Sequence, residues 1–291
     1  MSGRRVIGVD LGGTKILAGI LDEDGRLEDV SEQATPAVSQ EELLDALVET
    51  VEAMRAPDLE AVGFGVPARV DPGTGVALGA VNTPIHNVAF CEVLTERLGM
   101  RVAAINDGSA AALAEFTHGA GRGSRDLVLL SLGTGVGGGL VFDGKLYRGW
   151  SEVGHMVIVE DGEPCQGACT GRGHVESYCS GRAADRLARE LLGPSATAHD
   201  LVAQRHPALG QIGRHLGAAM ASLVNLFDPD IVVVGGGFGV AAGNLLLDPA
   251  REVLRREALA PAGDRVRLAV AELGPEAGLI GAGLVAFEAL E

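Results

Sequence analysis

The chain carries the same local pattern twice, once near residue 5 and again near residue 127. Each copy has an apolar run, a glycine-rich turn, a second short apolar run and an acid–glycine turn: RVIGVDLGGTKILAGILDEDG and LVLLSLGTGVGGGLVFDG. When the copies are aligned, Leu11-Gly12 falls on Leu132-Gly133, and Asp24-Gly25 has its counterpart in Asp143-Gly144. Short apolar runs separated by glycine are typical of two strands joined by a tight turn. A repeat this far apart predicts two related lobes and not a solenoid.

Strand patterns alternate with helix patterns along the rest of the chain. Strands are predicted at residues 5–11, 15–22, 61–67, 101–107, 231–237 and 265–273, and helices from Ser39, after residue 107, at 209–226 and at 276–291. Ser39 and Glu42 have the spacing of a capping box, which marks a helix start. The alternation indicates an α/β fold with a largely parallel sheet, to which the first two strands add an antiparallel hairpin.

Composition limits the classes of function that remain open. With 291 residues and 47% apolar content, the chain can bury a large core, and two domains are expected. A formal charge of −16 repels nucleic acid, although backbone N–H groups could still receive a small anion. We expect no membrane partner, because no apolar run reaches spanning length. The 4 cysteines, without a signal peptide or framework spacing, favour a reducing cytoplasm.

Glycine-rich turns are the first candidates for binding phosphate. In DLGGT (10–14), the glycines free the backbone to point N–H groups at a phosphate, and Asp10 could hold Mg²⁺ through water. The alternative is a plain hairpin with Asp10 exposed. The second hairpin, at 133–138, favours phosphate binding over a plain hairpin, because two such loops facing each other could hold a triphosphate.

Two further glycine motifs need separate interpretations. GTGVGG (133–138) matches the dinucleotide fingerprint, but that motif requires a following helix, and GLVFDGKL alternates like a hairpin. A Rossmann site is therefore rejected. VVVGGGFG (232–239) ends a buried strand with Gly235, Gly236 and Gly237, where a flat base could approach the backbone or where the glycines could simply permit packing.

The segment GHMVIVEDGEPCQGACTGRGHVE gathers histidines and cysteines in one glycine-rich stretch. His155, Cys165, Cys169 and His174 are separated by nine, three and four residues. Zn²⁺ takes four nitrogen or sulfur ligands, and short spacings on a flexible loop can supply a tetrahedron. The alternative is a metal-free loop with idle thiols. A Cys165–Cys169 disulfide is disfavoured by the reducing compartment.

Asn106 and Asp107 end a predicted strand just before an alanine-rich helix. Phosphoryl transfer to a hydroxyl needs a carboxylate that can take the proton. Taken alone, however, an aspartate before Gly-Ser-Ala is more often a helix N-cap.

In their order along the chain, DLGGTK, GFGVP, IND, LGTGVGGG, EVGH, the cysteine-rich stretch, VVVGGG and AGLIGAGL resemble the motifs of the ROK-family sugar kinases. More narrowly, the chain is similar to the bacterial ATP-dependent glucokinases of that family. The resemblance implies the actin-like ATPase (ribonuclease H-like) fold, an α/β fold with two related lobes around a central cleft. It implies a small lobe of 1–117 joined by the C-terminal helix 276–291, and a large lobe of 118–275 that carries the zinc loop. Some ROK members are repressors with an added DNA-binding domain, and we expect none here, because the first strand begins close to Met1.

The resemblance also assigns roles to individual residues. It makes Asp107 the general base and gives sugar binding to Gly65, Asn106, Asp107, Glu152, His155 and Glu176, with Asn82 as a weaker candidate. It implies ATP and phosphate binding by Asp10, Gly12, Gly13, Thr14, Lys15, Gly133, Thr134, Gly135, Gly137, Gly138, Gly235, Gly236 and Gly237. The sequence departs from the family pattern at Ala68, where glycine is usual, and at Gly108-Ser109, where Ala-Asn is usual.

Similar kinases bind zinc with one histidine and three cysteines. Here the third cysteine position corresponds to His174, which would make a structural Cys₂His₂ site from His155, Cys165, Cys169 and His174. Cys179 is an alternative ligand, disfavoured because it falls in the following helix.

The function implied is transfer of the γ-phosphate of ATP, with Mg²⁺, to the 6-hydroxyl of a hexose, with glucose as the first expectation. The alternatives are mannose, fructose, allose or an N-acetylhexosamine as substrate, or a sugar-sensing regulator without catalysis. Polyphosphate as donor is weakly disfavoured by the charge of −16. The resemblance implies a cytoplasmic homodimer or homotetramer.

Overall fold

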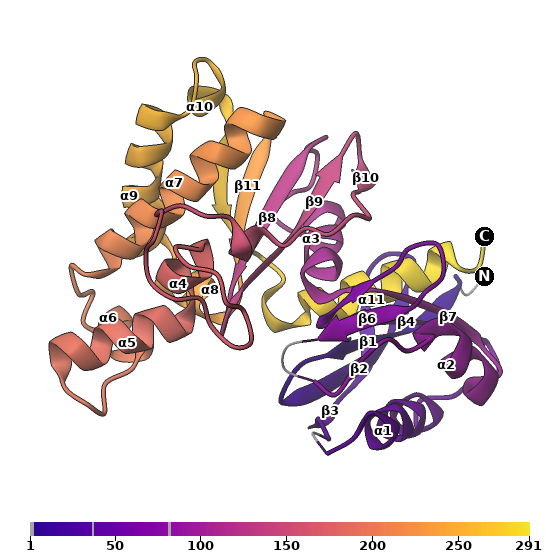
Figure 1. Cartoon of the computed structure of the whole chain (residues 1–291). Coiled ribbons are helices and arrows are strands. Elements are labelled where there is room, and N and C mark those ends of the chain that lie inside the picture. The colour runs from indigo at the N-terminus through magenta and orange to yellow at the C-terminus, as the bar shows by residue number, and fades with distance from the viewer. Residues whose placement is uncertain (1–2, 37, 81–82) are drawn as a thin grey trace. The chain divides into compact units, whose positions relative to one another are not determined.

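The computed structural model describes residues 3–36, 38–80 and 83–291, and the chain divides into two compact units (Figure 1). Unit 1 contains Met1–Ala114, Arg148–Trp150 and Glu276–Glu291. Unit 2 contains Glu115–Tyr147 and Ser151–Pro275. Each unit is built on its own five-stranded sheet.

The sheet of unit 1 has the order β3-β2-β1-β4-β7. Its strands are β1 (Arg5–Leu11), β2 (Lys15–Asp22), β3 (Leu27–Ala34), β4 (Leu59–Val66) and β7 (Arg101–Asn106). β1 pairs antiparallel with β2 and parallel with β4, and β4 pairs parallel with β7, so the predicted hairpin and parallel sheet are confirmed. The sequence LEDVSEQA of β3 was missed because nearly all of this edge strand is exposed, so it lacks an apolar signal.

The helices of unit 1 begin and end at recognisable signals. α1 (Gln40–Glu52) begins after Ser39, whose Oγ accepts the Glu42 N–H at 3.2 Å, as the capping spacing predicts. α2 (Phe90–Leu98) ends at Gly99 in the left-handed region, with φ 62°. A small hairpin of β5 (Ala68–Val70) and β6 (Ala77–Ala80) and the start of α3 (Asp107–Thr117) complete this unit together with α11.

Helix α11 (Ala277–Glu288) packs on the sheet of unit 1 with unusually close backbones. A Cβ atom added to Gly63 of β4 would lie 1.8 Å from the Ala282 carbonyl oxygen, and one added to Gly8 of β1 would lie 2.5 Å from the Leu279 carbonyl oxygen. On the other side of the helix, a Cβ atom at Gly281 would lie 1.9 Å from the Ala110 carbonyl oxygen. The glycines of these strands and of AGLIGAGL therefore let α11 fit between the sheet and α3.

Unit 2 repeats the sheet of unit 1 with the order β10-β9-β8-β11-β12. Its strands are β8 (Leu127–Leu132), β9 (Val136–Phe142), β10 (Lys145–Leu146), β11 (Ile231–Gly235) and β12 (Arg267–Val270). As in unit 1, an antiparallel hairpin is extended by parallel pairing of the first strand with later strands. The matching order confirms the repeat predicted from the sequence. Because β9 begins within GTGVGG, at Val136, and no helix follows the motif directly, the rejection of a Rossmann helix is also confirmed.

Two predicted strands of unit 2 were too long. The strand predicted at 265–273 is limited to Arg267–Val270: the helix α10 (Ala262–Arg265) includes its first residue, and residues 271–273 lie beyond its end. β11 stops at Gly235, and the last glycine of the predicted strand, Gly237, instead opens the helix α8 (Gly237–Ala242). In both cases an adjoining helix takes residues at the end of the apolar run.

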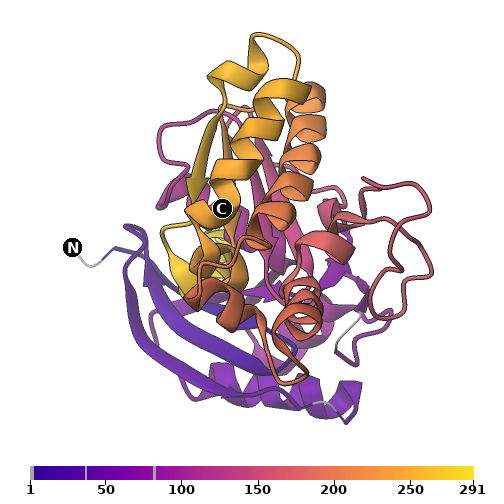
Figure 2. The ribbon, with the colours of Figure 1, turned by 90° about the vertical axis from the view of Figure 1, so that its left-hand side faces the viewer.

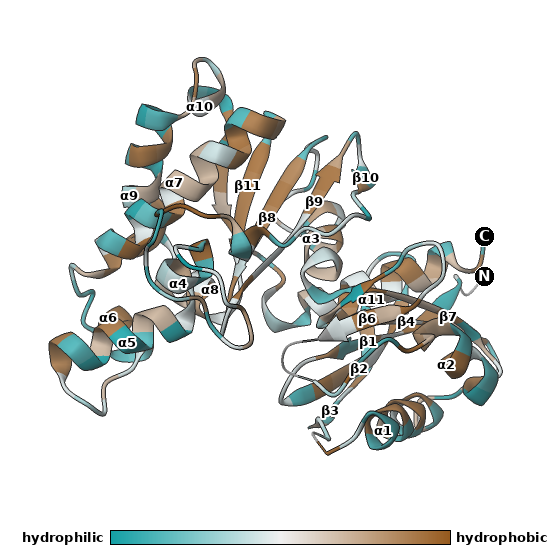
Figure 3. Cartoon of the chain, viewed as in Figure 1, coloured by the Kyte–Doolittle hydropathy of each residue, from teal (hydrophilic) through white to brown (hydrophobic). Residues whose placement is uncertain are grey.

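The remaining helices lie around the sheet of unit 2. They are α4 (Val175–Cys179), α5 (Gly181–Leu192), α6 (Ala198–Ala203), α7 (Leu209–Phe227) and α9 (Asn244–Glu257), with short 3₁₀ turns at Val153–His155 and Gly274–Glu276. α7 and α9 run side by side (Figures 1 and 2), where Gly213 and Gly217 let the two backbones approach. The apolar strands β8 and β11 form the centre of the core (Figure 3). In the described parts of the chain, no helix combines the length and the apolarity needed to cross a membrane.

The close packing of α11 predicts a large effect of one methyl group. Gly63→Ala should lower the free energy of unfolding by about 3 kcal/mol, because the backbone of α11 must move to admit the Cβ atom. Gly79→Ala is the matched control, since a Cβ atom on this strand residue meets nothing within 4 Å. Urea denaturation measures both variants; an equal, small change in both would show that α11 does not depend on Gly63.

Candidate functional site

Four of the predicted residues gather at one edge of the sheet in unit 1. Asp10 pairs with Gly65 in the register of β1 and β4, and Val66 pairs with Asn106 in the register of β4 and β7. Asp107 follows as the first residue of α3. Because β1, β4 and β7 are parallel, their carboxyl ends lie together, which is where α/β sheets place ligands.

Asp10 is a half-buried residue whose carboxyl group lies near a second acid, Asp107. Burial and, to a smaller extent, the charge of Asp107 together raise the pKa of Asp10 to about 7, and the charge of Lys15 opposes the shift. A Cβ atom at Gly278 of α11 would lie 2.6 Å from Asp10 Cγ, so the helix leaves no space behind this carboxyl group. The pKa of Asp10 is higher in the folded chain than in the unfolded chain. The contribution of Asp10 to the free energy of unfolding therefore falls as the pH rises from about 4 to about 7. Such a costly carboxylate is typical of a functional site.

The entry to α3 separates two roles that the sequence left open. Asn106 Oδ1 accepts the N–H of Ser109 at 3.2 Å, which is the hydrogen bond of a helix N-cap. Asn106 Nδ2 donates to Asp107 Oδ1 at 3.0 Å, and the Gly108 N–H donates to the same oxygen at 2.8 Å. The capping residue is thus Asn106, and Asp107 lies in the first turn, where the helix dipole favours a carboxylate.

The loop after β1 is fixed as a tight turn with an exposed tip. The Gly12 N–H donates to the Lys15 carbonyl at 2.9 Å, and Thr35 Oγ1 donates to the Gly12 carbonyl at 2.7 Å. Gly13, Thr14 and Lys15 are exposed. Lys15 forms an ion pair with Glu32 at 2.8 Å, and an exposed pair of this kind is worth at most about 1 kcal/mol, so a phosphate could replace Glu32.

In unit 2, packing requires some glycines of the loop after β8 and does not require others. Added Cβ atoms at Gly133 and Gly137 would meet nothing within 4 Å, so packing does not require glycine there, although the Gly133 N–H is already used by the Gly135 carbonyl at 3.0 Å. At Gly138 a Cβ atom would lie 2.3 Å from the Leu129 carbonyl, and at Gly135 it would lie 2.2 Å from Glu176 Oε2. Packing therefore requires glycine at position 138, where the neighbour is backbone, whereas at position 135 only the end of the Glu176 side chain would have to move. Thr134, between these glycines, is exposed.

The glycines after β11 lie beside the same loop. Gly236 has φ 75°, and its added Cβ atom would lie 2.5 Å from the carbonyl carbon of Leu132 at the end of β8. Gly235 packs more loosely, with Ala271 Cβ at 3.4 Å, and Gly237 faces open space. Packing explains Gly236, while Gly237 offers backbone to a ligand.

Also in unit 2, the four predicted zinc ligands come together at one point. The ligand atoms of His155, Cys165, Cys169 and His174 all lie within 4.8 Å of one another. The two Nδ1 atoms are 3.2 Å apart, Cys165 Sγ lies 3.7 Å from His155 Nδ1, and Cys169 Sγ lies 3.8 Å from His174 Nδ1. A tetrahedral zinc ion with ordinary bond lengths requires about 3.3 Å between nitrogens and about 3.6 Å between nitrogen and sulfur. The donor set and its spacing therefore fit structural zinc.

Cys179 does not belong to this cluster. Its side chain is fully buried, its Sγ lies 3.8 Å from the Ile212 carbonyl oxygen, and burial raises the pKa of its thiol well above the ordinary value. The preference for His174 over Cys179 therefore agrees with the positions of both side chains.

The loop that carries the cysteines is held by backbone and side-chain hydrogen bonds. The Cys165 N–H donates to the Gly171 carbonyl at 2.9 Å, and the Gly173 N–H donates to the Glu163 carbonyl at 2.8 Å. The Glu163 N–H donates to the Tyr178 hydroxyl at 2.7 Å, which ties the loop to α4. Between His155 and His174 the loop has only isolated bridges and turns, so these contacts and the four-residue cluster define its shape.

The predicted sugar-binding residues of unit 2 flank this cluster. Glu152 is exposed just before His155, and His155 directs Nδ1 to the cluster, which leaves Nε2 for another partner. Glu176 Oε2 accepts the Val136 N–H at 2.8 Å, while Glu176 Oε1 lies 3.9 Å from Cys165 Sγ. Glu176 thus connects the cysteine loop with the glycine loop, a contact that sequence reasoning missed. Asn82 lies outside the described residues.

Thr35 and Gly278 are two further site residues that sequence reasoning missed. Thr35 follows the exposed strand β3 and gave no signal of its own. Gly278 belongs to AGLIGAGL, whose glycine spacing in a helical pattern could have indicated a close approach.

Comparison with known proteins gives one consistent result. A sequence model described as the ROK family matches residues 6–289. A glucokinase of Streptomyces coelicolor is 34% identical, with 97% of this chain and 97% of the relative covered. An N-acetylmannosamine kinase of Salmonella newport is 33% identical, with 96% of this chain and 97% of the relative covered. The crystal structure of a ROK family glucokinase from Streptomyces griseus in complex with glucose and AMPPNP superposes with a TM-score of 0.84 at 35% identity, covering 98% of this chain and 99% of that chain.

These matches extend over nearly the whole chain and over both repeated sheets. The fold is accordingly the actin-like ATPase fold of the ROK sugar kinases. The chain belongs to the ROK family.

Proposed function

We propose that the chain is an ATP-dependent hexose kinase that transfers the γ-phosphoryl group of ATP to the 6-hydroxyl of glucose. The observation that carries this proposal is the match, over 98% of the chain, to a glucokinase solved with glucose and AMPPNP. Glucokinases of Streptomyces coelicolor and Halalkalibacterium halodurans, 34% and 31% identical, support the same activity. The site residues of this chain provide a chemical role for each part of that reaction.

Asp107 is the proposed general base. Its carboxylate lies in the first turn of α3, next to Asn106, at the carboxyl edge of the parallel strands. A carboxylate within hydrogen-bond reach of the 6-hydroxyl can take its proton as the new phosphate ester bond forms. Asn106, held by the Ser109 N–H, is proposed to hold the sugar, together with Gly65 on the adjacent strand.

The proposed phosphate-binding groups come from the two repeated loops. In unit 1 these are Asp10, Gly12, Gly13, Thr14 and Lys15; in unit 2 they are Gly133, Thr134, Gly135, Gly137, Gly138, Gly235, Gly236 and Gly237. Exposed backbone N–H groups in glycine turns suit phosphate oxygens. Mg²⁺ supplied with ATP would neutralise phosphate charge, and Asp10 is the residue proposed to hold it through water.

Zinc is proposed to have a structural role in recognition of the sugar. The ion would be held by His155, Cys165, Cys169 and His174. By binding all four side chains, it would cross-link the loop. His155 Nε2, Glu152 and Glu176 are proposed to bind sugar hydroxyls from the two ends of that loop. Fixed positions of such groups lower the entropic cost of binding and orient the reacting hydroxyl.

A second candidate substrate is an N-acetylhexosamine. The 33% identity to an N-acetylmannosamine kinase is close to the 34% identity to glucokinase, so identity alone does not separate the two. We further propose a cytoplasmic location, where Cys165 and Cys169 stay reduced, and assembly as a homodimer or homotetramer. The lobes proposed are 1–117 with 276–291, and 118–275.

A panel of acceptors tests the proposed function. ADP formation would be measured with ATP and, in turn, glucose, mannose, fructose, allose, N-acetylglucosamine and N-acetylmannosamine, with polyphosphate as a second donor. The expected result is the highest kcat/KM with glucose and ATP. Turnover of N-acetylmannosamine alone would favour the second candidate, and sugar binding without any turnover would indicate a sensor.

The general base predicts a variant that binds but does not react. Asp107→Asn should lower kcat by at least about 100-fold, because the amide cannot accept the hydroxyl proton, while glucose affinity stays within about threefold. Steady-state kinetics and glucose calorimetry measure the two quantities. A variant with nearly full kcat would remove Asp107 as the base.

The cluster predicts loss of metal on a single substitution. Cys165→Ser should reduce zinc content from one ion per chain to a small fraction and raise the glucose KM, because the loop loses a thiolate ligand. Cys91→Ser is the matched control, since Cys91 lies in unit 1, outside the cluster. Metal analysis after gel filtration measures zinc; equal zinc content in both variants would contradict the proposed ligand set.

A further inference from the structure

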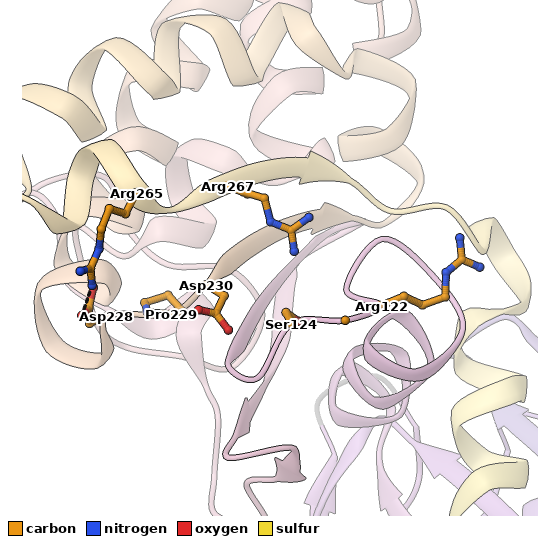
Figure 4. Close-up of a pocket in the computed structure, with 8 residues that line it drawn as sticks. Arg122, Ser124, Asp228, Pro229, Asp230, Arg265 and Arg267 are labelled. Atoms are coloured by element: carbon orange, nitrogen blue, oxygen red, sulfur yellow. Dashed lines mark hydrogen bonds and ion pairs between the residues drawn. The ribbon is translucent and has the colours of Figure 1, made fainter.

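A polar pocket in unit 2 lies at the opposite edge of the sheet from the phosphate-binding loops. The pocket has a volume of about 490 Å³ and is lined by residues that directly precede β8 and β11, and by Arg267 at the start of β12 (Figure 4). β8, β11 and β12 are parallel, so this is the amino edge of the sheet. The glycine loops at 133–138 and 235–237 follow the carboxyl ends of β8 and β11. The pocket is therefore distinct from the proposed catalytic site.

Arg267 is the central cationic group of this pocket. Its side chain is exposed, and its guanidinium group points into the space between Asp230 and Ser124 (Figure 4). Among the residues that the structure describes, Arg267 has no ion-pair partner within 4.0 Å. The neighbouring Arg265 is different, because it forms an ion pair with Asp228 at 3.0 Å (Figure 4). Arg267 thus retains hydrogen-bond donors that the protein does not use.

The acidic residues of the pocket already have donors of their own. Asp228 forms an ion pair with Arg265. Asp230 Oδ2 accepts the backbone N–H groups of Arg125 at 2.7 Å and Asp126 at 3.1 Å. These two hydrogen bonds are the main reason that the pKa of Asp230 lies below its ordinary value, with the charges of Arg125 and Arg267 as smaller causes. Asp228 thus has an ion-pair partner, and Oδ2 of Asp230 is hydrogen-bonded, while Asp230 keeps its negative charge near Arg267.

Two more donors come from the loop after α3. Arg122 also lines the pocket and is exposed, but its Nη1 donates to the His118 carbonyl at 2.8 Å and its Nη2 reaches Glu272 at 3.4 Å, so it keeps fewer unused donors than Arg267. The Gly123 N–H has no acceptor among the described residues, and Gly123 has φ 76°. A guanidinium fork, a second guanidinium and a backbone N–H form a donor set suited to phosphate oxygens.

We propose that this pocket is a second anion site, which binds the phosphate group of a small phosphorylated molecule through Arg267, with Arg122 and the Gly123 N–H as further donors. The site concentrates cationic donors on a chain of formal charge −16, where an anion would otherwise be repelled. Inorganic phosphate and the phosphate of a sugar ester offer the same oxygens, and the pocket volume admits either. Because the site lies at the amino edge of the sheet, its ligand would not compete with ATP.

Calorimetric titration of the full chain with inorganic phosphate tests the proposal. The titration is performed at low salt with saturating Mg²⁺-AMPPNP, and repeated with glucose 6-phosphate. One phosphate per chain is expected in the wild type, with at least about tenfold weaker binding in Arg267→Gln, because the best-placed donors are lost. Tighter binding of glucose 6-phosphate than of phosphate, lost in Arg267→Gln, would identify the ester as the ligand of this pocket, whereas tighter binding kept in that variant would report the sugar site; equal affinity would identify the free anion.

Arg255→Gln is the matched control, because Arg255 is an exposed arginine of α9 outside the pocket. Its phosphate affinity should equal that of the wild type, and Arg122→Gln should give a smaller loss than Arg267→Gln. The proposal is wrong if the wild type binds no phosphate, if Arg267→Gln keeps its affinity, or if Arg255→Gln loses as much. The comparison of the two arginine variants does not depend on kinase activity, so its failure is distinguishable from failure of the proposed function.

Discussion

The meeting of four side chains, His155, Cys165, Cys169 and His174, is the constraint on which the candidate sugar site depends. The loop between the two histidines contains no helix or extended strand, and a segment of that length does not hold one shape by backbone hydrogen bonding alone. Cross-linking through one metal ion would fix both ends of the loop and its tip at once. Glu176 connects the cysteine loop with the glycine loop at 133–138, because its carboxylate accepts the Val136 N–H.

Close backbone packing has the corresponding role in unit 1. Gly63 and Gly281 bring α11 against the sheet and α3, and Gly278 of the same helix closes the space behind Asp10. The result is a carboxyl group held by burial in a state that is costly when ionised. Ionised Asp10 thus lowers the stability of the fold at the carboxyl edge of the sheet. A destabilising carboxylate there is consistent with a site that receives a cation and phosphates.

The sequence predicted the elements whose signal is local. β1 and β2 have the bounds that their apolar runs predict, and the repeated Leu-Gly turns correctly indicated two sheets of equal order. The strand β3 was missed because its exposure removes the apolar pattern, and β12 was overestimated because α10 takes the residues before it. Asn106, and not Asp107, caps α3, since a local pattern does not tell which of two adjacent residues has the extended backbone of a cap. The hydrogen bond between the Val136 N–H and Glu176 joins residues 40 apart in the sequence, so no local sequence pattern predicts it.

The most direct test of this account is the sugar affinity of the wild-type protein before and after removal of its metal. Exhaustive chelation, with zinc content measured on the same sample, should raise the glucose KM by about tenfold or more and change the ATP KM much less, because the metal would order the loop with the proposed sugar-binding groups directly and the glycine loop only through Glu176. Added zinc should restore the original value. A metal-free protein that keeps its full glucose affinity would contradict the account.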